Sequence, residues 1–233
     1  MQFSELTLEK VILEARYNNA PLFWDNSGKA MSVLIRKYPK FELVNAQLSN
    51  VQSNWWDEAI VFNFNNQKAD ISQDYPASLE TFKGVASAMC DAVREYLELR
   101  SYTRIGVRYI LTYPLSSAED ARDFFLKLGL IAVPAERLQR FTKGKTEEQQ
   151  VMIRFEDEDR GYAFRLSHTP REFSVKISRP IDVRTDKFKK NVIIFDVDCF
   201  TKKNVEAPAF SAPDFIRITF KTLENNLLAI VGL

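Results

Sequence analysis

The chain has 233 residues, of which 45% are hydrophobic and 27% are charged, as in an ordinary soluble globular protein. Its 32 lysines and arginines balance 31 aspartates and glutamates, so the chain has no large net positive charge that would attract polyanions. A nucleic-acid site would have to be a local patch. No apolar run approaches the roughly 18–20 residues of a membrane span, and the first residues do not resemble a secretory signal. We therefore expect a cytoplasmic protein in which Cys90 and Cys199 are buried thiols rather than a disulfide.

The first part of the chain alternates predicted strands with one long predicted helix. Residues 8–17 alternate apolar and polar side chains, which predicts a strand with one buried face. The stretches 41–51 and 58–64 predict two further strands joined by polar turns, whereas 32–36 is too short to assign. Residues 78–100 repeat apolar side chains at three- and four-residue spacing, and this pattern predicts an amphipathic helix.

Two adjacent tryptophans precede the strand predicted over 58–64. The alternation of Ile60 and Phe62 with their neighbours places Trp56 on their face and turns Trp55 to the other one. Because aromatic residues mostly serve packing, we interpret Trp55 as a lid on the edge of the core or a half-buried surface indole. A platform that stacks a ligand is the less favoured interpretation.

The stretch 104–111 carries the residues that matter most for function. Its side chains alternate, so Tyr109 and its apolar neighbours face one way while Arg104, Gly106 and Arg108 face the other. The pattern predicts a strand with one buried face. Two guanidinium groups then share the opposite face, and what they meet there is the main functional question.

The second half predicts helices followed by an antiparallel meander. Ser116 to Glu119 has the spacing of a capping box, which predicts a helix that runs to Leu128 and ends at Gly129. A short helix from 134 to about 141 and a polar loop over 143–148 follow. Three strands are predicted next, over 151–155, 162–166 and 173–177.

Residues 192–200 form a second charged strand, and a helix ends the chain. Asp196 and Asp198 lie on one face of this strand, about 7 Å apart, and apolar residues occupy the other. The terminal helix is predicted to start near Ser211. We expect its apolar stripe to be buried in the core or against a second copy of the chain. The stripe consists of Ile216, Phe220, Leu223, Leu227 and Ile230.

The order of these segments resembles that of a known family. Arg104-Ile105-Gly106-Val107-Arg108-Tyr109 follows the long helix, and Phe195-Asp196-Val197-Asp198-Cys199-Phe200 precedes the last one. The chain resembles an uncharacterised, sporadically distributed family of bacterial proteins that share an Arg-x-Gly-x-Arg-Tyr strand and a downstream Asp-x-Asp-x-Phe strand. Ile110-Leu111 stands where that family is expected to have Ile-Asn. The resemblance implies the fold and the order of its elements, and it carries no activity.

Composition disfavours several classes of function. The single histidine, His168, would have to carry any histidine-based metal site or catalytic triad alone, and we interpret it as a turn residue at a strand end. The seven glycines form neither a phosphate loop nor a dinucleotide fingerprint. We interpret the basic run 184–190 as a solvated loop, which disfavours a nucleic-acid partner.

Six charged residues on three predicted strands meet on one sheet face if these strands are neighbours. We interpret the set primarily as a cross-strand ladder of ion pairs with matching signs. Two sharper hypotheses stay open, in which the arginines hold an anionic group or the aspartates hold a divalent cation. The set consists of Glu14, Arg16, Arg104, Arg108, Asp196 and Asp198.

These patterns predict an α+β protein, with a mostly antiparallel sheet and about three helices packed on it. We expect one compact domain over 1–233, with two sub-halves, 1–115 and 116–233, as the alternative division. The predicted function is a non-enzymatic interaction or sensing module that acts with a macromolecular partner and needs no cofactor. That partner is an unknown protein, or a second copy of the chain docked through the C-terminal helix. The alternative is a metal-assisted enzyme that acts on phosphate-containing substrates through Asp196 and Asp198.

Overall fold

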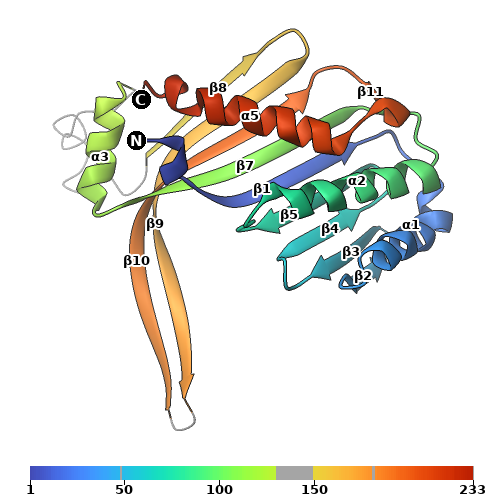
Figure 1. Cartoon of the computed structure of the whole chain (residues 1–233), viewed down its shortest axis with the longest axis horizontal. Helices are drawn as coiled ribbons and strands as arrows, with labels where there is room; N and C mark the ends of the chain where they lie inside the picture. Colours follow the sequence, from blue (N-terminus) through green and yellow to red (C-terminus); the bar gives the residue numbers. More distant parts are fainter. Residues whose placement is uncertain (48, 130–148, 180–181, 233) are drawn as a thin grey trace.

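Figure 1 shows a computed structural model of the chain, which describes residues 1–47, 49–129, 149–179 and 182–232. Its central element is a nine-stranded sheet in which every neighbouring pair of strands is antiparallel. Across the sheet the strands are β2 (Glu42–Gln47), β3 (Asn50–Trp55), β4 (Ile60–Phe64), β5 (Lys68–Asp74), β1 (Thr7–Arg16), β7 (Arg104–Leu115), β10 (Asp182–Thr201), β9 (Arg160–Arg179) and β8 (Gln149–Glu156). A second, two-stranded sheet pairs β6 (Ser101–Tyr102) with β11 (Val205–Glu206).

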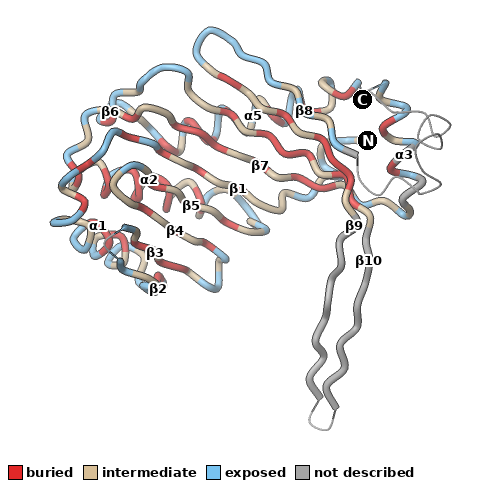
Figure 2. Tube along the Cα trace, turned by 180° about the vertical axis from the view of Figure 1, so that it is seen from behind, coloured by how far each residue is buried: buried red, intermediate tan, exposed pale blue. Residues whose placement is uncertain are grey.

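The helices of the described residues lie on one face of the large sheet, and no described helix covers the opposite face, which we call the uncovered face (Figures 1 and 2). The helices are α1 (Phe23–Lys37), α2 (Leu79–Tyr96), α3 (Ala118–Lys127) and α5 (Ala212–Ile230), with the short 3-10 helices η1 (Phe3–Glu5) and η2 (Ala207–Ala209). The predicted α+β class is therefore confirmed. None of these helices is long and apolar enough to cross a membrane.

Side-chain caps explain where three of the helices begin. Ser78 accepts a hydrogen bond from the Glu80 backbone and caps α2, and Ser211 accepts one from Asp214 and caps α5. The capping box of α3 pairs Ser117 with the residue at 120, one position later than predicted. Helix α1 has no side-chain cap, and its sequence did not predict it.

The core lies between the sheet and the helices. The alternation predicted for 104–111 is confirmed, because Ile105, Val107 and Tyr109 are fully buried under the helices. The Tyr109 hydroxyl donates to the Ile216 carbonyl at 3.0 Å and lies 2.9 Å from the Thr219 hydroxyl, so strand β7 is bonded directly to α5. Three residues of the apolar stripe of the C-terminal helix, Ile216, Leu223 and Leu227, are buried within their own chain, whereas Phe220 and Ile230 are half-buried.

Several predicted strand boundaries are wrong. The stretch 41–51 is two strands, β2 and β3, and strand β5 was not predicted at all. The strands predicted over 162–166 and 173–177 are one continuous strand, β9. The short helix predicted from 134 and the loop over 143–148 lie outside the described residues.

Two single-residue predictions also change. Trp55 pairs with Ile60 and shares its face, where it packs against Tyr38 and Phe41, so it is a lid on the core edge but on the opposite face from that predicted. Trp56 is exposed in the turn. His168 is no turn residue, because it lies inside strand β9, buried on the core face.

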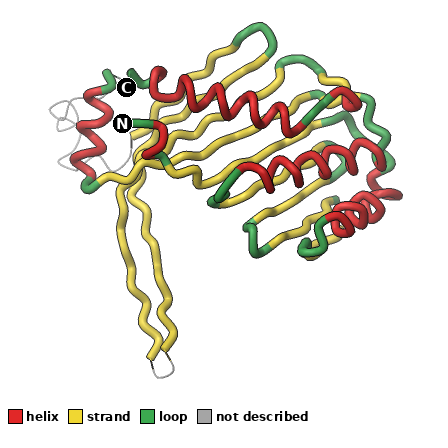
Figure 3. The backbone as a smooth tube through the Cα atoms, viewed as in Figure 1, coloured by secondary structure: helices red, strands yellow, loops and turns green. Residues whose placement is uncertain are grey.

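Strands β9 and β10 extend beyond the rest of the sheet as a two-stranded arm (Figures 1 and 3). Strand β7 pairs with β10 only over 191–200, and β8 pairs with β9 only over 161–168. We call residues 169–179 and 182–190 the arm. The structure describes no third strand on either side of it. For residues 170–179 and 182–190 the structure describes only the backbone.

Phe220 tests the packing of α5 on the sheet. Its half-buried ring lies 5.4 Å from the Tyr109 ring and 6.0 Å from the Phe3 ring, measured between centroids. Phe220→Ala should lower the free energy of unfolding by about 2–3 kcal/mol, less than a fully buried phenylalanine would cost. Ile218→Ala, on the exposed side of the same helix, should cost less than about 0.5 kcal/mol. Urea unfolding midpoints measure both, and equal losses would contradict this packing.

Candidate functional site

The sheet brings all six predicted charged residues together, because β1, β7 and β10 are neighbours. They lie on the uncovered face, opposite the helices. Strands β5, β9 and β8 add four more charged side chains to this face, which sequence reasoning missed. We call the ten residues the charged face: Glu14, Arg16, Lys68, Asp70, Arg104, Arg108, Arg154, Arg165, Asp196 and Asp198.

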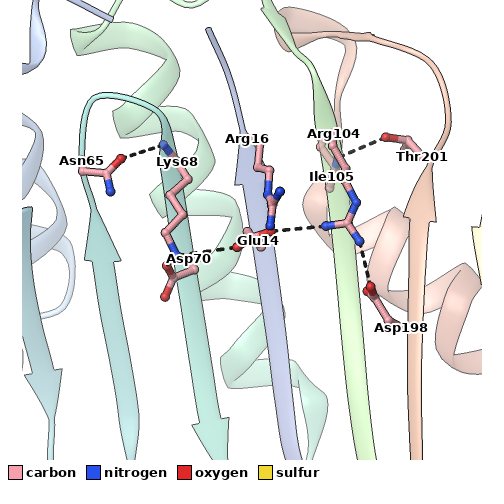
Figure 4. A network of polar contacts seen from close by, with 9 residues as sticks. All are labelled: Glu14, Arg16, Asn65, Lys68, Asp70, Arg104, Ile105, Asp198 and Thr201. Carbon is pink, nitrogen blue, oxygen red and sulfur yellow. Dashed lines mark hydrogen bonds and ion pairs between the residues drawn. The ribbon is translucent and has the colours of Figure 1, made fainter. Parts of the chain in front are cut away.

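Directly opposite positions match in sign only where β10 takes part, with Arg108 opposite Asp198 and Arg165 opposite Asp196. Arg16 stands opposite Arg104, and Glu14 stands opposite both Asp70 and Gly106. Apart from the Arg165–Asp196 bond, the ion pairs between strands therefore form along diagonals, which long side chains can span. Figure 4 shows Arg104 bridging three strands, with Nη1 3.2 Å from Glu14 Oε1 and Nη2 2.7 Å from Asp198 Oδ2.

Two glycines make room for this diagonal arrangement. A Cβ atom at position 106 would lie 3.2 Å from Arg104 Nη1 and 3.3 Å from Asp198 Oδ1, so the missing side chain lets the guanidinium lie flat across β7. The same guanidinium lies 4.4 Å from the centre of the Phe200 ring. That ring covers Gly161, where any side chain would collide with it. The Gly106 of the Arg-x-Gly-x-Arg pattern is thus explained by close approach.

Asp196 is the least exposed acidic side chain of the face. Its side chain is 10% exposed and accepts hydrogen bonds from Arg108 Nε and Nη2, both at 2.6 Å. Arg165 Nη1 adds a third bond at 3.1 Å from the neighbouring strand. A bidentate guanidinium–carboxylate pair of this kind is both strong and geometrically specific.

The other end of the face is held by Lys68 on β5. Its amine lies 3.1 Å from Asp70 Oδ1 and 3.6 Å from Glu14 Oε2 (Figure 4). Arg16 donates to Glu14 Oε1 at 2.7 Å. Every acidic residue of the charged face therefore has a cationic partner.

The charged face is hollowed in two places. The larger hollow, of about 480 Å³, lies over Gly106, and the smaller one, of about 170 Å³, has Ala163 in its lining. Arg108 and Asp198 border both. Six cationic and four anionic side chains line the two hollows together, so the surface carries a small positive excess.

The geometry does not suit the aspartates to a divalent cation. Both oxygens of Asp196 already accept hydrogen bonds from guanidinium groups, and Asp198 is bonded to Arg104. A cation would have to displace these arginines and would meet their charge. Among the residues that the structure describes, no group of three or more His, Cys, Asp or Glu side chains is placed to hold a metal ion.

Comparisons with known proteins do not indicate a family for this chain. No model of a known protein family matches the sequence, and no curated protein matches it. The function is therefore argued from the arrangement of the strands and of the charged face.

Asp196 and Asp198 should differ in their effect on stability. Asp196→Asn strands the charges of Arg108 and Arg165 and should lower the free energy of unfolding by about 1–3 kcal/mol, less than for a fully buried pair because both arginines are partly exposed. Asp198→Asn, the matched control, should cost less because this carboxylate has one hydrogen-bonded arginine. Urea midpoints at neutral pH measure both. Millimolar Mg²⁺ or Mn²⁺ should shift neither wild type nor variants, and a rise confined to wild type would restore the metal hypothesis.

Titration of Asp198 should make the free energy of unfolding depend on pH. Burial raises its pKa above the ordinary value of 3.8, although Arg104 and Arg108 oppose the shift. The folded chain then binds this proton more tightly than the unfolded chain, so the contribution of Asp198 to stability falls as the pH rises from 3.8 through the folded pKa. Wild type should lose urea resistance relative to Asp198→Asn over that range. A constant difference from about pH 3 to pH 7 would contradict the raised pKa.

Proposed function

We propose that the protein is a non-enzymatic interaction module that binds a protein partner through the arm. The observation that carries this proposal is the length of β9 and β10 beyond their neighbours. Over 169–179 and 182–190 the two strands pair with each other, and no other described strand pairs with either.

An isolated two-stranded ribbon is only marginally stable in water. Each of its outer edges presents a row of backbone N–H and C=O groups that can pair with a further strand. Natural proteins usually shorten or cover such edges, so an arm of this length is best explained by a partner that covers it. Addition of a strand from another protein supplies the missing hydrogen bonds, with side-chain contacts setting the specificity.

The C-terminal helix is a weaker candidate for the contact with a partner. Ile216, Leu223 and Leu227 of its stripe are buried in this chain, so no second copy is needed to cover them. The metal-assisted enzyme is also disfavoured, because its two aspartates are bonded to arginines. The arm remains the feature with which no other described strand pairs.

Shortening the arm tests the proposal. Residues 171–190 are replaced by Asn-Gly, a turn that joins the paired residues Pro170 and Asn191 in a tight hairpin. The sheet should keep its urea midpoint, because the strands that flank β9 and β10 pair only below this point. Proteins captured from the source cells by the full-length chain and identified by mass spectrometry should be lost with the shortened chain.

A matched control alters the opposite edge of the sheet. Leu43→Ser changes an exposed apolar residue on edge strand β2 and should leave the captured proteins unchanged. If the shortened chain retains every specific partner, or if Leu43→Ser loses them equally, the arm is not the binding element.

A further inference from the structure

Hydrogen-bond donors and acceptors are not evenly matched on the charged face. Both oxygens of Asp196 and both oxygens of Glu14 contact cationic groups, and Asp198 accepts a hydrogen bond from Arg104 through Oδ2. The surplus lies with the arginines. A surface with occupied acceptors and spare cationic donors attracts an anion.

The spare donors gather around the smaller hollow. Arg154 is exposed, and no residue that the structure describes forms a hydrogen bond or ion pair with it. Arg108 uses Nε and Nη2 for Asp196, which leaves Nη1 free of any described partner. Arg165 directs Nη1 to the same carboxylate, while its Nη2 contacts only the weakly accepting Met152 sulfur at 3.9 Å.

The strand register explains why these arginines surround one space. Ala163 stands between Arg154 on one side and Asp198 on the other, and Arg108 is next in the same row. Because the side chain of Ala163 is short, it leaves a gap over β9 between the longer side chains of Arg154, Asp198 and Arg108. The resulting hollow of about 170 Å³ is large enough for a tetrahedral oxyanion.

We propose that this hollow binds a phosphate group, held by Arg108, Arg154 and Arg165. Guanidinium groups suit the oxygens of phosphate because their N–H groups form a planar fork. The two aspartates in the lining do not oppose binding strongly, because both are already bonded to arginines. The site is independent of the arm, so either proposal can fail without the other.

Calorimetry at constant ionic strength tests the site with two probes. The first is inorganic phosphate, with chloride as the control anion. The second is a short phosphoserine peptide, with its unphosphorylated form as control. Binding of both probes, or of free phosphate alone, supports a small-molecule source, whereas binding of the phosphopeptide alone supports a phosphorylated protein. Binding of neither probe overturns the proposal.

Three variants place the binding in the hollow. Arg154→Gln removes a side chain without a described partner, so the fold should survive, and affinity should fall about tenfold or more. Ala163→Leu fills the hollow without changing any charge and should weaken binding similarly. Arg16→Gln, an arginine of the larger hollow only, is the matched control and should bind like wild type. Equal affinities for wild type, Arg154→Gln and Ala163→Leu would refute the site even if phosphate binds.

Discussion

The pairing of β7 with β1 on one side and β10 on the other holds the whole sheet together. Strand β7 joins five strands on the β1 side to three on the β10 side. Its two faces make the contacts that link these strands to each other and to the helices. On the covered face, the Tyr109 hydroxyl bonds the strand to α5. On the uncovered face, Arg104 bonds to Glu14 and to Asp198, which couples both neighbouring strands through one side chain.

The charged face links neighbouring strands through ion pairs while leaving two hollows between its side chains. Exposed ion pairs contribute roughly 0–1 kcal/mol each, so the partly exposed pairs of this face cannot dominate folding. The pairs matter more for geometry, because Arg104 lies close over Gly106 and stacks on Phe200, whose ring leaves room only for a glycine at 161. The bonds to Asp196 hold the guanidinium groups of Arg108 and Arg165 in place, which reduces the side-chain entropy that the protein would lose if these groups bound a ligand.

The sequence predicted the structure correctly where apolar and polar residues alternate along a strand or where a side chain caps a helix. It placed Arg104 and Arg108 on one face and Tyr109 on the other, and it located the start of α2 and α5. The sequence could not predict which residues form ion pairs, because diagonal pairing depends on strand register and on side-chain length. Arg108 contacts Asp196 rather than Asp198, which stands directly opposite.

Other residues were missed for identifiable reasons. Helix α1 begins without a side-chain cap, and the apolar alternation of β5 is interrupted by the buried Gln73, so neither element has the usual local signature. Arg165 could have been found, since it alternates with Phe164 and Leu166 in a strand that was predicted. Arg154 gains its importance from the register of β8 on β9, which a single sequence does not contain.

The position of β7 in the sheet also has a consequence for synthesis on the ribosome. Its partners are far away in the chain, with Arg104 contacting Glu14 90 residues earlier and Asp198 94 residues later. The strands up to β7 can assemble first, as N-terminal segments emerge first, but the side of β7 that receives β10 stays open until residues 191–200 have been made. Such distant pairing slows folding and leaves an apolar strand edge accessible in the nascent chain. A chaperone that shields this edge would act on the interval between the emergence of β7 and that of β10.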